Sequence, residues 1–380
     1  MRVYLDNAAT TKTAPEVVEA MHPYFTEKYG NASSIHSFGE EAKEALENAR
    51  EQLAKYINAE PEEIIFTSGG TESDNLAIKG TAYALKDKGK HIITSKFEHH
   101  AVLETCQALE KEGFEVTYIG ISKDGFVDIA ALKNAIRDDT ILATIMHANN
   151  EIGTIQDIEK IGEICREKGI IFHTDAVQSL GKIPIDVKNM RLDLASFSAH
   201  KLHGPKGIGA LYVRKKDKIT KLFYGGAQEF NLRPGTENVS GAVGFAKAIE
   251  LMSEQDIKNM TEFQDYLIDA LLQIPEACLN GSREKRLCNT VNVSFSHIEG
   301  ESVLLGLDDK GIAVSTGSAC TSQKLEPSHV LIAMGIKPED AHGSIRFSLS
   351  KYTTKEELDY AINAVKAVVE NLRKISPLGK

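Results

Sequence analysis

Short apolar runs alternate with amphipathic segments between about residues 60 and 225. The apolar runs have the length of buried strands, and they occur at 63–67, 91–95, 115–120, 141–148, 170–176, 194–199 and 209–214. The stretches between them repeat their apolar residues at helical spacing, as at 71–89 and 155–169. This alternation predicts an α/β fold, with a mainly parallel seven-stranded sheet flanked by helices on both faces.

The pattern changes after residue 238. Residues 239–275 keep helical spacing throughout, which predicts one long helix that bridges two domains. Strand-like runs follow at 290–295, 312–317 and 344–350, separated by helical segments and closed by a helical tail. This part predicts a smaller α+β domain. We place the large domain at residues 15–255, and the small domain at residues 1–14 together with 256–380.

The composition is that of a globular protein, with 42% hydrophobic and 26% charged residues over 380 positions. A net charge of −10 without a long Lys/Arg block argues against nucleic-acid binding. No apolar run reaches the roughly 20 residues that span a bilayer, and the N-terminus lacks the apolar stretch of a secretion signal. We therefore expect a cytoplasmic location.

The five cysteines are scattered and form no CxxC pair, so neither a disulfide framework nor a zinc site is indicated. Cys106 and Cys165 fall in helical patterns, where we expect them to pack as small hydrophobic residues. Cys320 differs, because it lies in the polar run STGSACTSQKLEP. A thiol in such surroundings is a candidate nucleophile, since thiolate chemistry requires access to solvent and substrate.

Two strand ends carry candidate ligand-binding groups. In FTSGGTESDN a strand ends at a glycine pair, and a helix begins at Thr71. Free backbone N–H groups at such a helix start, which Gly70 lets a ligand approach, form an anion site; the alternative is an ordinary capped turn. In IIFHTDAVQS a buried strand ends at Asp175, which could keep a pyridinium nitrogen protonated or only cap a turn.

The run SFSAHKLHGPKG places Lys201 among histidines and glycines. A lysine that forms an imine must lose its proton readily, which desolvation or nearby cations favour. Ser198 and His200 could hold a phosphate or order this lysine. Lys206, in the GPKG turn, is the rival lysine.

His99 and His100 follow the strand at 91–95, and one of them could stack on a ring and move protons near neutral pH. They have no Cys or carboxylate cluster at ligand spacing, so no metal site is predicted. Arg346 is a lone arginine in an apolar strand, which a substrate carboxylate or an internal Asp or Glu would have to balance. Together these groups indicate a pyridoxal phosphate site.

Motifs occur along nearly the whole chain: YLDNAATT, GNASSIHSFG, TSGGTESDNLAIKG, HANNEIGTIQ, HTDAVQSLGK, SFSAHKLHGPKGIGALYVR, RPGTEN, EGES and STGSACTS…EPSHVL. In combination they resemble the cysteine desulfurases that supply sulfur for iron–sulfur clusters. The resemblance implies a fold-type I pyridoxal-phosphate-dependent transferase of the class V aminotransferase family.

The resemblance also implies how the cofactor is held. Lys201 would form the imine, His99 would stack on the ring, and Asp175 would pair with the ring nitrogen. Gln178 would hydrogen-bond the ring hydroxyl. The phosphate would be held by Gly70, Thr71, Ser198 and His200, with Thr236 reaching over from the partner subunit of a homodimer.

For the substrate, L-cysteine, the resemblance implies that Asn31, Asn150 and Arg346 orient the carboxylate. Lys201 would remove the α-proton, and the Cys320 thiolate would attack the substrate sulfur, giving a persulfide and alanine. The persulfide would pass to an iron–sulfur scaffold protein or to an acceptor for tRNA thiolation. Apart from transient ligation of a cluster by Cys320, no metal is implied.

Three other functions share parts of this pattern. A selenocysteine lyase has the same fold and cofactor but depends less on a thiol, and an aminotransferase would have no use for Cys320. A non-catalytic assembly subunit would not be expected to keep Lys201, His99, Asp175 and Cys320 together.

The chain has TSGGTE and RPGT where the family commonly has TSGATE and RSGT. It ends at KISPLGK, earlier than larger bacterial members, which leaves the docking of a scaffold open.

Overall fold

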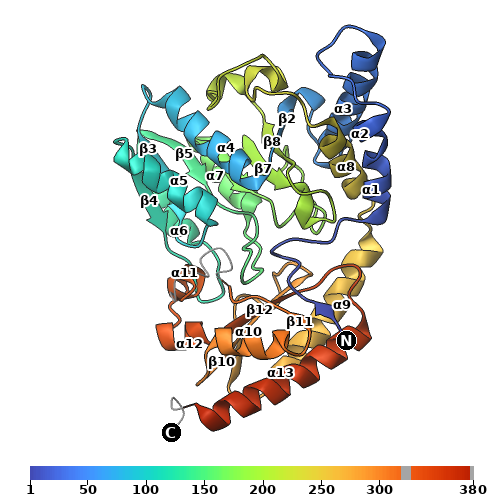
Figure 1. Cartoon of the computed structure of the whole chain (residues 1–380). Coiled ribbons are helices and arrows are strands. Elements are labelled where there is room, and N and C mark those ends of the chain that lie inside the picture. Colours follow the sequence, from blue (N-terminus) through green and yellow to red (C-terminus); the bar gives the residue numbers. More distant parts are fainter. Residues whose placement is uncertain (318–326, 377–380) are drawn as a thin grey trace.

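The computed structural model describes residues 1–317 and 327–376, and the chain forms two lobes (Figure 1). Within the described residues, the larger lobe is built on a seven-stranded sheet with the order β2-β8-β7-β6-β5-β3-β4. These strands are β2 (Ile64–Thr67), β3 (His91–Ser95), β4 (Glu115–Ile119), β5 (Thr140–Thr144), β6 (Ile171–Asp175), β7 (Leu194–Ser198) and β8 (Gly209–Val213). Only β8 runs antiparallel to its neighbours. The predicted α/β fold with a mainly parallel sheet is confirmed.

Helices cover both faces of the sheet, because successive strand residues point to opposite sides. Ile92 packs in the cluster of α4 (Gly70–Leu85) and α5 (His100–Lys111). Ile93 packs in the larger cluster that α3 (Ser37–Tyr56), α7 (Ile158–Lys168) and α8 (Val239–Glu250) complete. The remaining helical segments of this lobe are α1 (Pro15–Met21), α2 (Pro23–Thr26), α6 (Ile129–Ala135) and the 3₁₀ turns Pro61–Glu63, Ala199–Lys201, Lys216–Lys218 and Glu229–Asn231.

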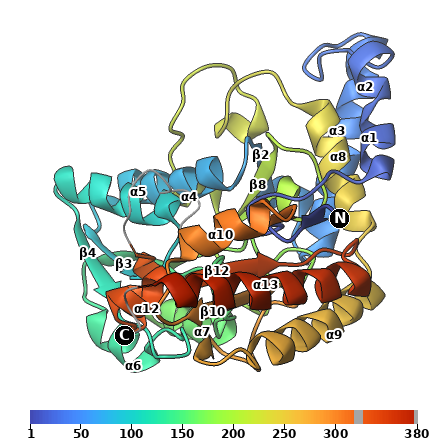
Figure 2. The same ribbon diagram turned by 60° about the horizontal axis from the view of Figure 1, so that its bottom comes forward.

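The smaller lobe has its own hydrophobic cluster, to which Val3 and Leu5 of the N-terminus also belong. Its strands are β9 (Ala277–Leu279), β10 (Thr290–Phe295) and β12 (Ser344–Ser348), which form an antiparallel sheet, and the parallel pair β1 (Val3–Tyr4) and β11 (Ile312–Ala313). Its helices are α9 (Glu254–Leu271), α10 (Gly300–Asp308), α11 (His329–Ala333), α12 (Pro338–His342) and α13 (Lys355–Ile375). Helices α9 and α13 pack against each other on the outside of this lobe (Figure 2).

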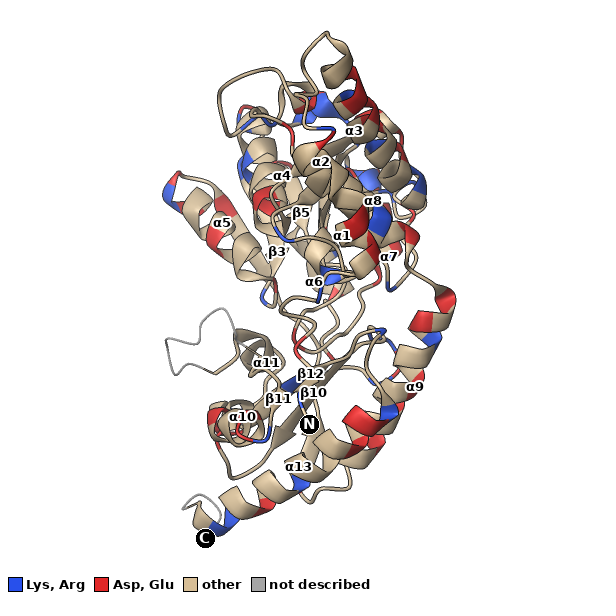
Figure 3. Ribbon diagram, turned by 45° about the vertical axis from the view of Figure 1, so that its right-hand side comes forward, with Lys and Arg blue, Asp and Glu red and all other residues tan. Residues whose placement is uncertain are grey.

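Charged residues lie on the outer helices of both lobes, among them α5, α9 and α13 (Figure 3). This distribution leaves the inner faces of the amphipathic helices to the cores. Cys106 and Cys165 are buried in these cores, as predicted. Within the described residues, no helix combines the length and apolar composition that a membrane-spanning segment requires.

The prediction of one long helix over 239–275 is wrong. Helix α8 ends at Glu250, and α9 begins at Glu254 after Ser253, whose hydroxyl accepts a hydrogen bond from the Asp256 N–H at 3.1 Å. A serine at this position caps a helix start, because its side chain satisfies an N–H that has no partner in the first turn. The break lets α8 pack into the large-lobe core and α9 into the small-lobe core.

The N-terminal segment joins the two lobes and reaches the carboxyl edge of the large sheet. On the small-lobe side, the Ala8 N–H donates to Ser348 Oγ at 2.8 Å. On the large-lobe side, the Thr11 N–H donates to the His200 carbonyl at 3.0 Å, and the Ala14 N–H donates to the His203 carbonyl at 2.9 Å. The segment between Ala8 and Ala14 is therefore fixed directly beside the turn that carries Lys201.

A buried ion pair anchors the loop that follows β8. Arg50 and Glu229 have side chains that are 3% and 4% exposed, and two hydrogen bonds of 2.8 and 2.9 Å join them. Glu229 also accepts a bond from the Phe66 N–H. Glu229 and the next two residues, Phe230 and Asn231, have positive φ angles of 46°, 56° and 65°. Such backbone is unfavourable for side-chain-bearing residues, so the ion pair has to hold it in place.

We predict that Arg50→Met lowers the free energy of unfolding by ~3–5 kcal/mol, because it leaves the Glu229 carboxylate buried without a counter-charge. Urea denaturation at one protein concentration measures the change. The double variant Arg50→Met/Glu229→Gln should recover part of the loss, since it removes the unpaired charge. A loss below ~1 kcal/mol in Arg50→Met would show that the pair does not anchor the loop.

Candidate active site

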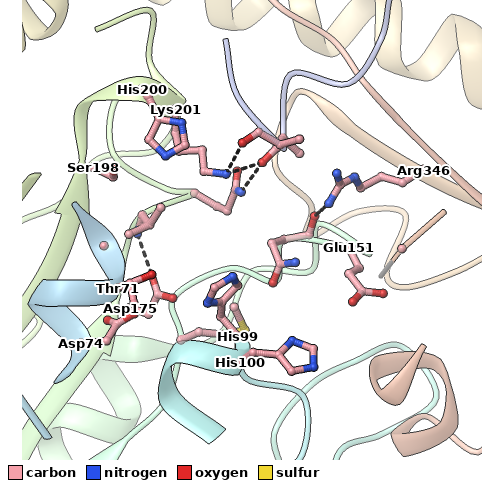
Figure 4. Close-up of a pocket in the computed structure, with 18 of the residues that line it drawn as sticks. Thr71, Asp74, His99, His100, Glu151, Asp175, Ser198, His200, Lys201 and Arg346 are labelled. Carbon is pink, nitrogen blue, oxygen red and sulfur yellow. Dashed lines mark hydrogen bonds between the residues drawn. The ribbon is translucent and has the colours of Figure 1, made fainter. Parts of the chain in front are cut away.

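A cavity of about 410 Å³ lies at the carboxyl edge of the large sheet, between this edge, the N-terminal segment and the small lobe. Asp175 ends β6 and Ser198 ends β7, so both lie where parallel strands present functional groups. Figure 4 shows His99 and Asp175 on one side of this space and Arg346 on the opposite side. Ten predicted site residues line the cavity: Gly70, Thr71, His99, Asn150, Asp175, Gln178, Ser198, His200, Lys201 and Arg346.

One end of the cavity has the features of an anion site. Gly69 precedes α4 with a φ of 154°, a conformation that only glycine adopts freely, and the first-turn N–H groups of α4 follow it. A Cβ at Gly70 would come within 2.6 Å of Val177 Cγ2, so a larger residue there would require Val177 to shift. Ser198 Oγ is buried and has no hydrogen-bond partner in the described chain. A hollow lined by Thr71, Ser198 and His200 opens beside these groups.

Asp175 is buried and faces the cavity. Its Oδ1 accepts a hydrogen bond from the Val177 N–H at 2.9 Å, which fixes the carboxylate at the strand end. Burial raises the pKa of Asp175 to about 6, against the opposing effects of the Val177 N–H and the Lys201 charge. A cation placed against this carboxylate would be stabilised by it and would favour its ionised form.

Lys201 reaches the cavity from the 3₁₀ turn that follows β7. Its Nζ donates to the carbonyl of Ala8 at 2.6 Å and to the carbonyl of Ala9 at 2.8 Å. The N–H of Gln178 Nε2 donates to the same Ala8 carbonyl at 3.0 Å, while its Oε1 is buried without a partner in the described chain. The N-terminal segment therefore sets the positions of both side chains.

His99 caps the start of α5 and is an uncharged ring at neutral pH. Its Nδ1 accepts a hydrogen bond from the Ala101 N–H at 3.1 Å, so the ring proton must be on Nε2. Burial, together with the charge of Lys201, lowers the pKa of His99 to about 4. His100 lies beside it and forms an edge-on contact with His329 at 4.8 Å between ring centroids.

Of the two partners that the sequence left open for Arg346, the structure shows the internal carboxylate, and the substrate carboxylate stays a prediction. Its Nη2 lies 3.0 Å from Asp6 Oδ1, so an internal carboxylate balances it, and its Nη1 donates to the Asn150 carbonyl at 3.0 Å. Its Nε is buried and has no partner in the described chain. A cavity-lining guanidinium that keeps one N–H unsatisfied can still bind an incoming carboxylate.

Three predicted residues do not line this cavity in the described chain. Asn31 lies before α3, where its Oδ1 accepts a hydrogen bond from the Ser33 N–H at 2.9 Å. Thr236 lines a separate hollow with Glu229 and Arg233. Cys320 lies outside the described residues. The roles proposed for these three residues stay predictions.

Sequence reasoning missed two carboxyl groups that line the cavity, Asp74 and Glu151. Burial raises the pKa of Asp74 well above its usual range, and the charge of Asp175 raises it further. Asp74 follows Thr71 by three residues, so helical spacing could have placed both on one face of α4. Glu151 follows Asn150 directly, and its carboxylate accepts a hydrogen bond from Ser328 at 2.5 Å. In the described ranges, no group of three or more His, Cys, Asp or Glu side chains is placed to hold a metal ion.

Comparison with known proteins places the whole chain in one family. Residues 3–361 match the family model "Aminotransferase class-V". The cysteine desulfurase IscS of Dictyoglomus turgidum is 58% identical over 379 residues, which cover 99% of this chain and 96% of the relative. That of Methanosarcina thermophila is 57% identical, covering 99% and 94%.

Solved structures agree with this assignment. A structure described as a NifS-like protein has a TM-score of 0.92 at 42% identity. The match covers 98% of this chain and 100% of the solved chain. The structure "SspA in complex with cysteine" has a TM-score of 0.84 at 40% identity. The match covers 93% of this chain and 100% of the solved chain. The chain therefore belongs to the class-V aminotransferase family, and within it to the cysteine desulfurases.

Proposed function

We propose that this cysteine desulfurase binds pyridoxal phosphate in the cavity and transfers the sulfur of L-cysteine to Cys320. The observation that carries the proposal is a set of buried polar atoms without hydrogen-bond partners in the described chain. They are Ser198 Oγ, Gln178 Oε1 and Arg346 Nε, and all three residues line the cavity. Buried polar groups are nearly always satisfied, so a polar ligand is expected here.

The residues fit a phosphorylated pyridine. The α4 N-terminus and Ser198 form a cradle for the phosphate, in which the hydroxyl of Ser198 becomes satisfied. Asp175 supplies the buried carboxylate that a protonated ring nitrogen requires, and Lys201 the amine that holds the aldehyde carbon. His99, neutral at physiological pH, offers a ring face without adding charge. When bound, the cofactor supplies an electron sink for the carbon skeleton of the substrate, which no protein side chain provides.

The substrate carboxylate is bound by Arg346 and Asn150. Asp6 and the Asn150 carbonyl hold the guanidinium in place from one side, while Nε remains available on the other. The neighbour described as a complex with cysteine supports this choice of ligand for the cavity. Asn31 would add to this set only if it came from a second subunit, because it does not line the cavity of its own chain.

Lys201 moves the α-proton of the substrate. Its Nζ accepts the proton from the substrate Cα, and the carbonyls of Ala8 and Ala9 stabilise the resulting ammonium. The Cys320 thiolate then attacks the substrate sulfur, so that an S–S bond forms and the Cβ–S bond breaks. The electron pair of the broken Cβ–S bond stays with the carbon skeleton. This skeleton then takes up protons and leaves as alanine. The persulfide on Cys320 passes to a thiol of an acceptor protein, for which an iron–sulfur scaffold is our proposal.

A second copy of the chain completes the site. Exposed apolar side chains gather on two segments of the large lobe, at Tyr29, Ile35 and Phe38 and at Phe223 and Tyr224, with Ile35 97% exposed. Ser33, in the first segment, donates through its Oγ to Glu237 Oε1 at 3.2 Å, which ties that segment to the loop of Thr236. Clustered exposed apolar residues indicate a protein interface. A homodimer through this surface would carry Thr236, one residue before Glu237, toward the partner's phosphate cradle.

Lys201→Ala is predicted to lose both the visible colour of bound cofactor and all turnover, because the amine that holds the cofactor is removed. An absorbance spectrum and an alanine assay with L-cysteine measure these effects. Lys206→Ala is the matched comparison, and it should keep the colour. Loss of colour in Lys206→Ala with retention in Lys201→Ala would assign the cofactor to the rival lysine.

Cys320→Ser is predicted to keep the colour and to bind L-cysteine, yet to form no protein persulfide. Mass spectrometry of the protein after addition of L-cysteine detects the added sulfur. Cys278→Ser is the control, because Cys278 is the exposed cysteine among the described residues. Persulfide on Cys278, or unchanged desulfuration by Cys320→Ser, would contradict the role of Cys320.

Mixing of inactive variants tests the shared site. In a heterodimer of Lys201→Ala and Thr236→Ala subunits, one site would combine an intact Lys201 with an intact Thr236 from the partner. We therefore predict that co-expressed and separately tagged heterodimers recover about half of the wild-type activity. If the activity of the heterodimer is no greater than that of the Thr236→Ala homodimer, Thr236 acts within its own subunit.

A further inference from the structure

Lys182 is a buried lysine that the mechanism above does not use. It follows Gly181 in the segment after β6, and it is 6% exposed. No carboxylate of the described chain lies within ion-pair distance of its ammonium group. Burial lowers the pKa of Lys182 to about 8, so the group is still charged at neutral pH. A buried cation without a counter-ion is costly, which calls for an explanation.

The hydrogen bonds of Lys182 connect two residues of the cofactor site. Its Nζ donates to the Gln178 carbonyl at 2.8 Å and to the Lys201 carbonyl at 3.3 Å. The side chains of these two residues meet at the N-terminal segment, where both donate to the Ala8 carbonyl. Lys182 thus holds the two backbones on one side while the N-terminal segment holds the two side chains on the other.

The charge of Lys182 also extends into the site. It contributes to the lowered pKa values of His200 and His203, for both of which burial is the larger cause. It acts in the same direction on the thiol of Cys288, whose pKa burial raises to about 11. A cation at this place makes a second positive charge on Lys201 less favourable. The loss of a proton from Lys201 is what imine formation requires.

We propose that Lys182 is a positioning residue of the desulfurase reaction, which fixes the backbones of Gln178 and Lys201 and places a buried positive charge behind the cofactor lysine. The inference rests on the proposed binding of pyridoxal phosphate at Lys201. It assigns to Lys182 no contact with substrate or cofactor. Its effect reaches the reaction through the orientation and the protonation of Lys201.

Two variants of the holoenzyme separate the hydrogen bonds from the charge. Lys182→Met removes both, whereas Lys182→Gln keeps an N–H donor near the carbonyls and removes only the charge. In both variants the pH at which the visible absorbance of the bound cofactor changes should rise by ~1 unit, because a cation that opposed protonation is gone. The affinity for pyridoxal phosphate should fall by ~10-fold in Lys182→Met and by less in Lys182→Gln. If Lys182→Met does not fold, Lys182→Gln still tests the charge.

His91→Leu is the control for loss of stability alone. His91 is buried at the amino end of β3, away from the cavity, and bonds Thr140 and Thr117 at 2.7 and 2.8 Å. This variant should unfold more easily than the wild type, and the visible absorbance of its bound cofactor should change at the same pH as in the wild type. An unchanged spectral titration in both Lys182 variants, or a shift in Lys182→Met alone, would overturn the inference. A wild-type protein that binds no coloured cofactor would instead overturn the proposed function itself.

Discussion

The strongest constraint on this structure is an excess of buried carboxyl groups at the carboxyl edge of the large sheet. Asp74, Asp175 and Glu98 are all buried there, and burial raises the pKa of Glu98 to about 8. His173 is the nearest basic side chain of the described residues to Asp74, at 3.7 Å, and burial lowers its pKa to about 3. A positive charge added beside these groups would favour their ionised forms. In the proposed function, a protonated ring nitrogen against Asp175 would supply this charge, and Lys201 would be the amine that binds the ring.

The position of Lys201 depends on parts of the chain that are far apart in sequence. Residues 8 and 9 accept hydrogen bonds from its ammonium group, and Lys182 donates to its carbonyl. The N-terminal segment also bonds to β12, the strand that carries Arg346. The amine that we propose to move the proton and the guanidinium that we propose to bind the carboxylate are therefore both positioned by one continuous segment. A shift of one lobe relative to the other would change the distance between them.

The sequence was sufficient to predict the large sheet and to name ten residues that line one cavity, and it was insufficient where a local capping bond or a contact between distant segments decides the structure. All seven predicted strands match, because each is a short run of strand-forming residues bounded by turn residues, although the edge strand β4 is mostly half-buried. The helix break at Ser253 was missed, since helical spacing continues across it and the capping bond is local. The strands β1 and β9 are too short to give a pattern. Lys182 and Asp74 were missed because they approach the site residues through contacts with other segments of the chain. Asp175 and Ser198, in contrast, end strands, and Lys201 lies in the turn directly after one.

The fate of the carbon skeleton of L-cysteine tests the central claim most directly. Attack on the substrate sulfur leaves the electron pair on carbon and gives alanine, whereas elimination of the sulfur would give pyruvate and ammonia. Alanine, pyruvate and sulfide should be quantified together, with L-cysteine, a reductant and the cofactor-loaded protein. Our account predicts equal amounts of alanine and sulfide with no pyruvate. Sulfide accompanied by pyruvate, or no alanine at all, would contradict it.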